Sequence, residues 1–234
     1  MAFTIRPAPA TAATARTIRE IEVSALEESA LARLLWSPPP PSTVTETTPT
    51  QLNSSPSTTS PAAVVNIDRE LIFLQDPANH YLLATDTANA KDVGYVWWQY
   101  TKGRTKAQWA ETYTNRYRPE GMKKVLADAT TGAQFLKRAE LLGDRDVFTL
   151  KELYVHPHFQ RCGVGSMLVE WGVKKADECG LMAYTEASPQ GLGLYLKYGF
   201  EEVDRHTVDL EPWGGRKGEE SSYGLLLRKV RVGK

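Results

Sequence analysis

The chain has 234 residues, enough to bury one sizeable hydrophobic core and leave residues over for insertions. Lysine plus arginine and aspartate plus glutamate both number 28, so the formal net charge is zero, which argues against a protein dedicated to binding nucleic acid. No apolar run approaches the length of a membrane span, and the first residues lack the layout of a signal peptide. We therefore expect a single domain over residues 1–234, with no nucleic-acid and no membrane partner.

The alternation of residues 3–6 predicts a first strand, and the apolar spacing of residues 14–36 predicts a helix that ends at a run of prolines. Residues 37–62 are almost entirely Pro, Ser, Thr and small side chains. Such a segment cannot bury enough apolar surface to offset the entropy of ordering it. We expect a disordered insertion there, with a binding segment for a partner domain as the alternative.

Hydrophobic periodicity and turn residues predict the elements of the remaining chain. Before residue 147 the predicted order is helix, strand, strand, helix and helix, at residues 67–74, 81–85, 92–101, 106–117 and 122–142. After it the order is strand, helix, strand, helix, strand and strand, at residues 147–155, 164–179, 182–186, 189–198, 200–210 and 222–230. This order predicts a mixed α/β fold.

The two cysteines, Cys162 and Cys179, fall at opposite ends of the predicted helix 164–179. They are too far apart along that helix to form a disulfide. Because the chain has no other thiol, we expect a reduced, cytoplasmic compartment.

A glycine-containing turn, residues 156–166, connects a predicted strand to a predicted helix. The first N–H groups of a helix have no internal partner and carry partial positive charge, and glycines let the backbone approach a phosphate. A Walker A loop is excluded, because Gly165 is followed by Ser166 and Met167 where Lys and then Ser or Thr are needed. A dinucleotide-binding turn would need a third glycine. The turn therefore predicts a site for a different phosphorylated ligand.

The stretch Gln160-Arg161-Cys162-Gly163-Val164-Gly165 resembles the Gln/Arg-x-x-Gly-x-Gly/Ala signature of the GNAT superfamily of acyl-CoA N-acyltransferases. A second stretch, residues 188–200, looks like the family's short helix ending in Tyr-x-x-x-Gly-Phe. The enlarged connection at residues 102–142 is similar to that of a branch of uncharacterised fungal members. The resemblance implies an α/β (α+β) fold with a twisted, mostly antiparallel mixed sheet flanked by helices.

The apolar phase of the predicted strand 147–155 slips between Leu150 and Leu153, which predicts a β-bulge near Lys151 and Glu152. In the family that the chain resembles, the fourth strand bulges and pairs with the pantetheine arm of coenzyme A, and the glycine turn binds the pyrophosphate. The resemblance thus implies acetyl-CoA as acyl-donor co-substrate, and no metal. The implied binding residues are Leu153, Tyr154, Val155, Gln160, Arg161, Cys162, Gly163, Val164, Gly165 and Ser166.

Tyr195 occupies the position of a family tyrosine that commonly protonates the departing thiolate of coenzyme A; a core aromatic is the alternative. The acceptor amine must lose a proton before it attacks, since an alkylammonium with a pKa of about 10 has no free electron pair. A carboxylate can accept that proton. Glu152, at the predicted bulge, is the first candidate base because some family members use a glutamate on this strand, and Glu186 is the second.

Two other groups of residues contain side chains that could bind a metal or an anion. His156, His158 and Cys162 have loose spacing and lack a fourth ligand, so no metal site is predicted. The segment 102–142 is locally basic, which would suit an acidic substrate or form a solvated helix face. Its basic residues are Lys102, Arg104, Lys106, Arg116, Arg118, Lys123 and Lys124.

These observations predict an N-acetyltransferase that moves the acetyl group of acetyl-CoA directly to a primary amine of a small molecule or a peptide. A coenzyme A-binding module without catalysis, serving regulation or scaffolding, is the competing class. A phosphate-binding α/β protein for another nucleotide is the third. No motif in the chain encodes the acceptor or the oligomeric state.

Overall fold

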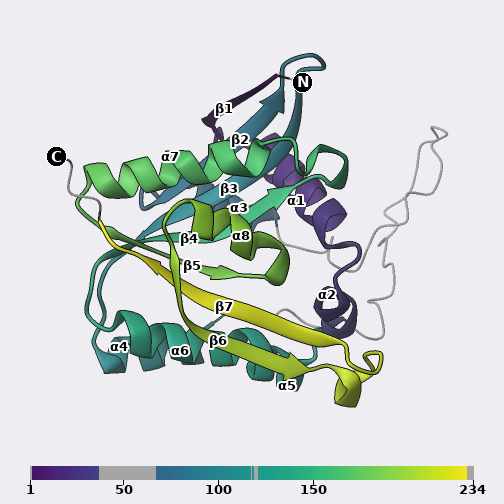
Figure 1. The fold of residues 1–234 in the computed structure, drawn as a ribbon, viewed down its shortest axis with the longest axis vertical. Helices are drawn as coiled ribbons and strands as arrows, with labels where there is room; N and C mark the ends of the chain where they lie inside the picture. The colour runs from purple at the N-terminus through teal and green to yellow at the C-terminus, as the bar shows by residue number, and fades with distance from the viewer. Residues whose placement is uncertain (1, 37–66, 117, 119–120, 231–234) are drawn as a thin grey trace.

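The computed structural model describes residues 2–36, 67–116, 118 and 121–230 (Figure 1). The strands are β1 (Phe3–Pro7), β2 (Asn79–Asp86), β3 (Lys91–Thr101), β4 (Val147–Val155), β5 (Met182–Ala187), β6 (Glu201–Asp209) and β7 (Glu220–Arg228). The helices are α1 (Ala12–Leu26), α2 (Ala30–Leu35), α3 (Ile67–Gln75), α4 (Lys106–Thr114), α5 (Lys124–Ala127), the π-helical turn η2 (Asp128–Gly132), α6 (Ala133–Leu142), α7 (Val164–Glu178) and α8 (Pro189–Lys197), with short 3₁₀ turns η3 (Pro157–Phe159) and η4 (Glu211–Trp213). The predicted insertion at residues 37–62 lies outside the described residues, and its disorder stays a prediction.

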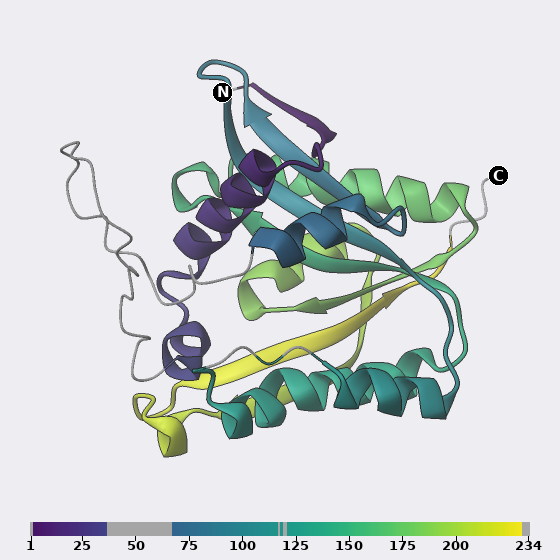
Figure 2. The same ribbon diagram turned by 180° about the vertical axis from the view of Figure 1, so that it is seen from behind.

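The strands form one seven-stranded sheet in the order β1-β2-β3-β4-β5-β7-β6. Neighbouring strands are antiparallel except for the central pair β4 and β5, which is parallel. Helices α7 and α8 cover one face (Figure 1). On the other face α1 and α3 lie over the β1–β4 half and α4 to α6 lie over the β5–β7 half (Figure 2). The sheet is therefore mixed and flanked by helices on both faces, as predicted.

Apolar clusters on the two faces hold these layers together. Under α7, Leu168 and Val169 pack on Trp98 and Phe148 of the sheet. Under α1 and α3, Ile18 of α1 packs with aromatic residues of β2 and β3. A third cluster joins α4 and α6 to β4, β5 and β7, and a fourth joins α2, α5 and the loop after β6. None of the described helices is long and apolar enough to cross a membrane.

Helix α7 packs so closely on the sheet that one of its positions has room only for glycine. A Cβ at Gly172 would lie 1.9 Å from the indole ring of Trp98, which is fully buried and stacks on Phe148 with ring centroids 5.1 Å apart. We expect Gly172→Ala to lower the free energy of unfolding by about 1–3 kcal/mol, because α7 must move off the sheet. Chemical denaturation measures this change.

Gly193→Ala on α8 is the matched control for that substitution. Nothing lies within 4 Å of a Cβ added at Gly193, so the higher helix propensity of alanine should raise the free energy of unfolding by up to about 1 kcal/mol. Opposite signs for the two variants would support close packing of α7. A Gly172→Ala variant as stable as the Gly193→Ala variant would contradict it.

The N-terminal helical region differs from the prediction of one helix over residues 14–36. The structure has two helices, because α1 ends at Leu26 and α2 begins at Ala30. The side chain of Ser29 accepts a hydrogen bond from the Ala32 N–H at 3.2 Å. A serine cap of this kind satisfies the free N–H groups of a new helix and so separates the two segments.

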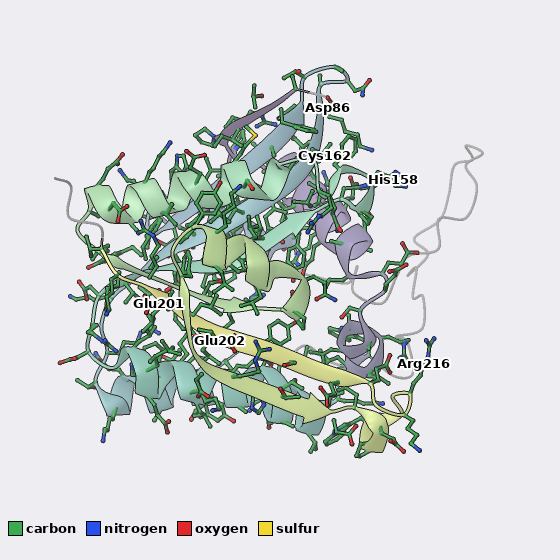
Figure 3. The ribbon with its side chains drawn as sticks, in the orientation of Figure 1. Asp86, His158, Cys162, Glu201, Glu202 and Arg216 are labelled. Atoms are coloured by element: carbon green, nitrogen blue, oxygen red, sulfur yellow. The ribbon has the colours of Figure 1, made fainter. Side chains whose placement is uncertain are left out.

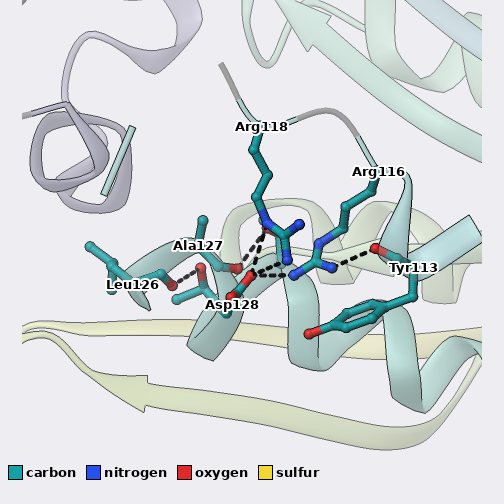
Figure 4. A network of polar contacts seen from close by, with 8 residues as sticks. Tyr113, Arg116, Arg118, Leu126, Ala127 and Asp128 are labelled. Carbon is teal, nitrogen blue, oxygen red and sulfur yellow. Dashed lines mark hydrogen bonds and ion pairs between the residues drawn. The ribbon is translucent and has the colours of Figure 1, made fainter. Parts of the chain in front are cut away.

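The insertion between β3 and β4 also differs in detail. Helix α4 ends at Thr114, short of the predicted 117, and the predicted helix 122–142 contains the π-helical turn η2. Arg116 and Arg118 both donate hydrogen bonds to Asp128, the first residue of η2 (Figure 4). These ion pairs tie the loop after α4 to the start of the helix that carries α6 across the sheet.

Candidate active site

Strand β4 contains the predicted β-bulge. Trp97 pairs with Glu152 but Trp98 pairs with Leu150, so Lys151 has no partner residue on β3. A bulge turns two consecutive side chains toward the same face of a sheet. Accordingly the Lys151 ammonium lies 5.8 Å from the centroid of the Trp97 ring, on the α1 face, and Glu152 next to it also contacts that face through Tyr95.

Strands β4 and β5 separate directly after this bulge. Their parallel pairing runs only from Val147 to Leu150, and β5 beyond Thr185 pairs with β7 alone. The second half of β4 therefore has strand β3 on one side and no strand partner on the side of β5 among the described residues. Main-chain groups on that side are available to an extended ligand.

The alternation of antiparallel pairing decides which of the three predicted main-chain groups face this gap. The His156 N–H donates to the Val93 carbonyl at 2.9 Å, and alternation from that pair turns the main chain of Tyr154 toward β3. The main-chain N–H and C=O groups of Leu153 and Val155 face the gap. The Gln160 side chain donates a hydrogen bond to the Val155 carbonyl at 3.1 Å. The main chain of Tyr154 thus pairs with β3, which corrects the prediction that it pairs with the ligand, and its ring packs against Tyr95 with centroids 5.7 Å apart.

The turn before α7 has the backbone of an anion-binding site. Arg161 has φ of 62° and Gly163 has φ of 90°, both in the left-handed region that a non-glycine residue seldom adopts. Gly163 is the N-cap residue and provides no side-chain hydrogen bond to the helix. The backbone N–H groups of Val164 to Ser166, in the first turn of α7, therefore remain available to a ligand.

Strain at Arg161 fits such a role, because left-handed non-glycine residues concentrate at ligand-binding turns. Cys162 and His158 lie near each other in the upper part of the view, and Arg216 lies in the lower part (Figure 3). Both cysteines are free, and both are exposed. The described residues contain no group of three or more His, Cys, Asp or Glu that could hold a metal ion.

Glu152 lies in a charged and aromatic environment that the sequence did not indicate. The Tyr95 hydroxyl donates a hydrogen bond to Glu152 Oε2 at 2.8 Å. Burial raises the pKa of the Glu152 carboxyl above the ordinary glutamate value, and the nearby positive charge of Arg19 opposes that rise. Arg19 Nη2 in turn pairs with Glu70 Oε2 at 3.0 Å, and Arg19 also pairs with Glu22. Three carboxylates thus surround one guanidinium.

Glu186, the second candidate base, is already engaged. Arg138 of α6 lies 3.3 Å from Glu186 Oε1, and the Tyr184 hydroxyl donates to the same oxygen at 2.9 Å. These contacts engage the Glu186 carboxylate in an ion pair and a hydrogen bond within the protein. The geometry favours Glu152 as the base.

Tyr195 is only 6% exposed and packs edge-on against Phe200 with ring centroids 5.8 Å apart. It lies on α8, which packs against β5 and β7 beside the gap. Burial raises the pKa of the Tyr195 phenol, while a hydrogen bond with Thr185 opposes the rise. Tyr195 therefore belongs to the core, and it is a protonated phenol next to Thr185, the last β5 residue that pairs with β4. Its role as a proton donor stays a prediction.

Several residues of this site could not be recognised from the sequence. Tyr95, Arg19 and Glu70 carry no motif, and they reach Glu152 only because α1 and α3 pack across β2, β3 and β4. Arg138 arrives from the insertion between β3 and β4. The weak signal available for Arg138 was the basic character of the segment 102–142.

The observed fold matches that of a known class of proteins. A seven-stranded mixed sheet with one central parallel pair, flanked by helices on both faces, is the fold of the GNAT acyl-CoA N-acyltransferases, as the resemblance implied. Residues 126–202 match the family model described as "Acetyltransferase (GNAT) domain". That segment contains the β-bulge, the turn before α7 and Tyr195.

Solved structures with this fold extend over nearly the whole chain. Arylalkylamine N-acetyltransferase 2 from Aedes aegypti has a TM-score of 0.62 at 14% identity, covering 99% of this chain and 100% of its own. The mosquito arylalkylamine N-acetyltransferase like 5b has a TM-score of 0.62 at 13% identity, with coverage of 97% and 99%. A structure described as histone acetyltransferase HPA2 and related acetyltransferase, from Corynebacterium glutamicum, has a TM-score of 0.57 at 16% identity, with coverage of 100% and 99%. No curated protein matches the chain in sequence.

Proposed function

We propose that this protein is an N-acetyltransferase that transfers the acetyl group of acetyl-CoA directly to a primary amine. One observation carries the proposal: the bulge in β4 puts Glu152, with its raised pKa, beside the gap between β4 and β5, and the same strand leads into the turn before α7. A base, an extended main-chain edge and an anion-binding turn thus follow one another along the chain from Glu152 to Ser166.

The chain's own groups divide the work of binding. The free N–H groups at the start of α7 hold the diphosphate, and Leu153 and Val155 offer main-chain groups to the pantetheine arm. Bound acetyl-CoA supplies a thioester, whose carbonyl carbon is open to attack by an amine. Main-chain N–H groups where β4 leaves β5 stabilise the negative charge that develops on the carbonyl oxygen.

Proton transfer completes the reaction. Glu152 accepts a proton from the acceptor ammonium, which frees the nitrogen electron pair to form the new C–N bond. The C–S bond breaks, and the sulfur leaves as a thiolate that takes a proton from the Tyr195 phenol. The attacking nitrogen loses its second proton as the amide forms, and that proton restores the phenol through solvent. A thiol has a pKa of about 8.5 against about 10 for an ordinary phenol, and burial raises the pKa of Tyr195 further. The thiolate therefore leaves readily without help, and Tyr195 contributes modestly.

We therefore expect Tyr195→Phe to lower kcat by up to about 10²-fold, at the low end of general acid catalysis, and to leave the dissociation constant of acetyl-CoA unchanged. Tyr198→Phe, at the C-cap of the same helix, is the control and should retain the wild-type kcat. Steady-state kinetics with the best amine, together with calorimetry for binding, measures both. Equal kcat values for the two variants would assign Tyr195 to the core alone.

The proposal is tested by measuring thiol release from acetyl-CoA against a panel of primary amines, and binding of coenzyme A, ATP and NAD by calorimetry. Release with at least one amine supports the enzyme. Tight binding of coenzyme A without release on any amine would favour the noncatalytic module. Equal or tighter binding of ATP or NAD would favour a site for another nucleotide.

Other features of the proposal stay predictions. They are a cytoplasmic location, a single-domain organisation, a resemblance to fungal members, and an acceptor that is a small molecule or a peptide. Measuring acetylation of free amines and of peptide amines in parallel separates the two kinds of acceptor.

A further inference from the structure

The bulge in β4 presents two opposite charges on one face of the sheet. In a regular strand Lys151 and Glu152 would point to opposite faces, and one of them would enter the core under α7. Lys151, which has no partner residue on β3, instead lies near Trp97. This is the face that also holds Glu152 and Tyr95, which donates a hydrogen bond to Glu152. The site therefore has a positive and a negative group side by side.

Each of these two residues lies next to further side chains that carry the same charge as itself. Around Glu152, on the α1 side, the carboxylates of Glu22 and Glu70 add negative charge, and Arg19 is the positive charge among them. Beside Lys151, on the α6 side, the guanidinium groups of Arg104 and Arg138 add positive charge, and Glu186 is paired with Arg138. We name these the acidic group (Glu22, Glu70, Glu152) and the basic group (Arg104, Arg138, Lys151).

The basic group has more positive charge than its protein partners neutralise. Within the described part of the chain, Lys151 and Arg104 form no ion pair, although both are half-buried. Arg104 instead lies over the Trp109 ring at 4.9 Å, and Arg138 has its single carboxylate at 3.3 Å. Half-buried cations without a counter-ion are costly, which makes this group complementary to an external anion.

The perturbed titration of the lysine agrees with this geometry. The positive charge of Arg138, together with burial, lowers the pKa of Lys151 to about 7. Burial and Arg138 likewise lower the pKa of Arg104. The positive charges of the basic group thus repel one another more than the carboxylates of Glu186 and Glu152 offset at Lys151, and a bound anion would relieve that repulsion and favour the charged form of Lys151.

Coenzyme A does not account for the basic group. The turn that we assign to the diphosphate precedes α7, which covers the opposite face of the sheet from α6 and Arg138 (Figures 1 and 2). An anion at the basic group therefore belongs to the acceptor. The ammonium of that acceptor must approach Glu152 to lose its proton.

We propose that the acceptor is a zwitterion, a primary amine whose molecule also carries a carboxylate, with its ammonium at Glu152 and its carboxylate at Arg104, Arg138 and Lys151. This inference rests on the proposed acetyltransferase function and adds the substrate class. Arginine suits such a role because its planar guanidinium group pairs with a carboxylate through two hydrogen bonds. The site would discriminate between amines by the presence of the second charge.

The test compares amines that differ only in the carboxylate. Glycine, β-alanine, 4-aminobutyrate, 6-aminohexanoate and tryptophan are each assayed against methylamine, ethylamine, propylamine, pentylamine and tryptamine, the matching amines without the carboxylate. Because the spacing between the two charges is varied, one pair should match the site. For that pair we expect kcat/KM of the zwitterion to be about tenfold to a hundredfold higher, the range of a hydrogen bond to a charged group.

Variants of the basic group complete the test. Arg104→Met keeps an apolar contact with Trp109, and Arg138→Met leaves Tyr184 as the partner of Glu186. Both should bring the ratio of kcat/KM within the best pair close to one. Lys106→Met, at an exposed position of α4 in the same insertion, should keep the wild-type ratio. Thermal melting checks that each variant is folded.

The outcomes distinguish this inference from the function on which it rests. If amines are acetylated but those without a carboxylate are equal or better at every spacing, the zwitterion is excluded and the acetyltransferase stands. Amines such as tryptamine would then be the better class. If coenzyme A binds but no amine of either kind is acetylated, the proposed function fails and this inference fails with it. An unchanged ratio in both arginine variants would also overturn the inference.

Discussion

Replacing Glu152 by glutamine is expected to lower kcat/KM for amine acetylation by about 10²–10⁴-fold, the usual contribution of a general base. Glutamine keeps the shape of the side chain, and its carbonyl oxygen can still accept the hydrogen bond from Tyr95. It cannot accept a proton from the acceptor ammonium. The dissociation constant of acetyl-CoA should remain that of the wild type, because Glu152 lies on β4 and not on the turn before α7 to which we assign the diphosphate.

Glu22→Gln is the matched control for this substitution. Glu22 belongs to the same acidic group and pairs with Arg19, but it lies on α1 and not on the bulged strand. Removing its charge tests whether the loss of activity follows from the charge of the acidic group or from the missing base. We expect kcat/KM of Glu22→Gln to stay within a few-fold of the wild type. Equal losses in the two variants would contradict the role of Glu152 as base.

The pH profile gives an independent measurement of the same role. A base must be deprotonated to act, so kcat/KM should fall as the pH drops through the pKa of Glu152. Burial raises that pKa, which means that activity is lost at a higher pH than for an ordinary glutamate. In Glu152→Gln the acid side of the profile should be flat. A wild-type profile that falls only near the ordinary glutamate pKa would point to a different base.

The second large effect is expected at the turn before α7, from Ser166→Asp. Ser166 is the third residue of α7, where a carboxylate interacts favourably with the helix N-terminus, so the melting temperature should not fall. The same carboxylate would repel the diphosphate of acetyl-CoA. Two charges about 4 Å apart near a protein surface interact by roughly 4 kcal/mol, so we expect the dissociation constant to rise by about tenfold to a thousandfold after partial screening.

Ser166→Asn separates charge from shape at this position. Asparagine has the size of aspartate without the negative charge. The Ser166→Asn variant should bind acetyl-CoA at least tenfold more tightly than Ser166→Asp, a difference of about 1.4 kcal/mol or more that the Coulomb estimate covers after screening. Raising the salt concentration should narrow the difference. Calorimetry of the three proteins provides the measurement. If Ser166→Asp binds acetyl-CoA as the wild type does, the diphosphate does not lie on the first turn of α7.

Local features of the site were accessible from the sequence because neighbouring residues determine them. The shift in apolar phase between Leu150 and Leu153 requires an extra residue in the strand, and the structure has that residue at Lys151. The caps of α8 follow the same rule: Ser188 accepts a hydrogen bond from the Gly191 N–H, and Pro189 occupies the first turn. The prediction of a single helix over residues 14–36 was wrong because a helix cap, Ser29, interrupts the periodic segment between α1 and α2.

The side chains that surround Lys151 and Glu152 could not be predicted from the sequence. Arg19 and Glu70 lie far from Glu152 in the sequence, and Arg138 lies far from its partner Glu186. Their apolar spacing and helix propensity are those of ordinary surface helices. Only the packing of α1, α3 and α6 against the sheet makes them part of the site.

The sequence by itself determined the strand with its bulge, the glycine turn and the helix that follows, because backbone geometry depends on side-chain period, capping and glycine within a few residues. The tertiary structure alone decided that Glu152 has a raised pKa, and that cations gather on one side of it and carboxylates on the other. The physical reason is that burial and electrostatic interaction depend on distance in space, and the order of strands in the sheet sets that distance.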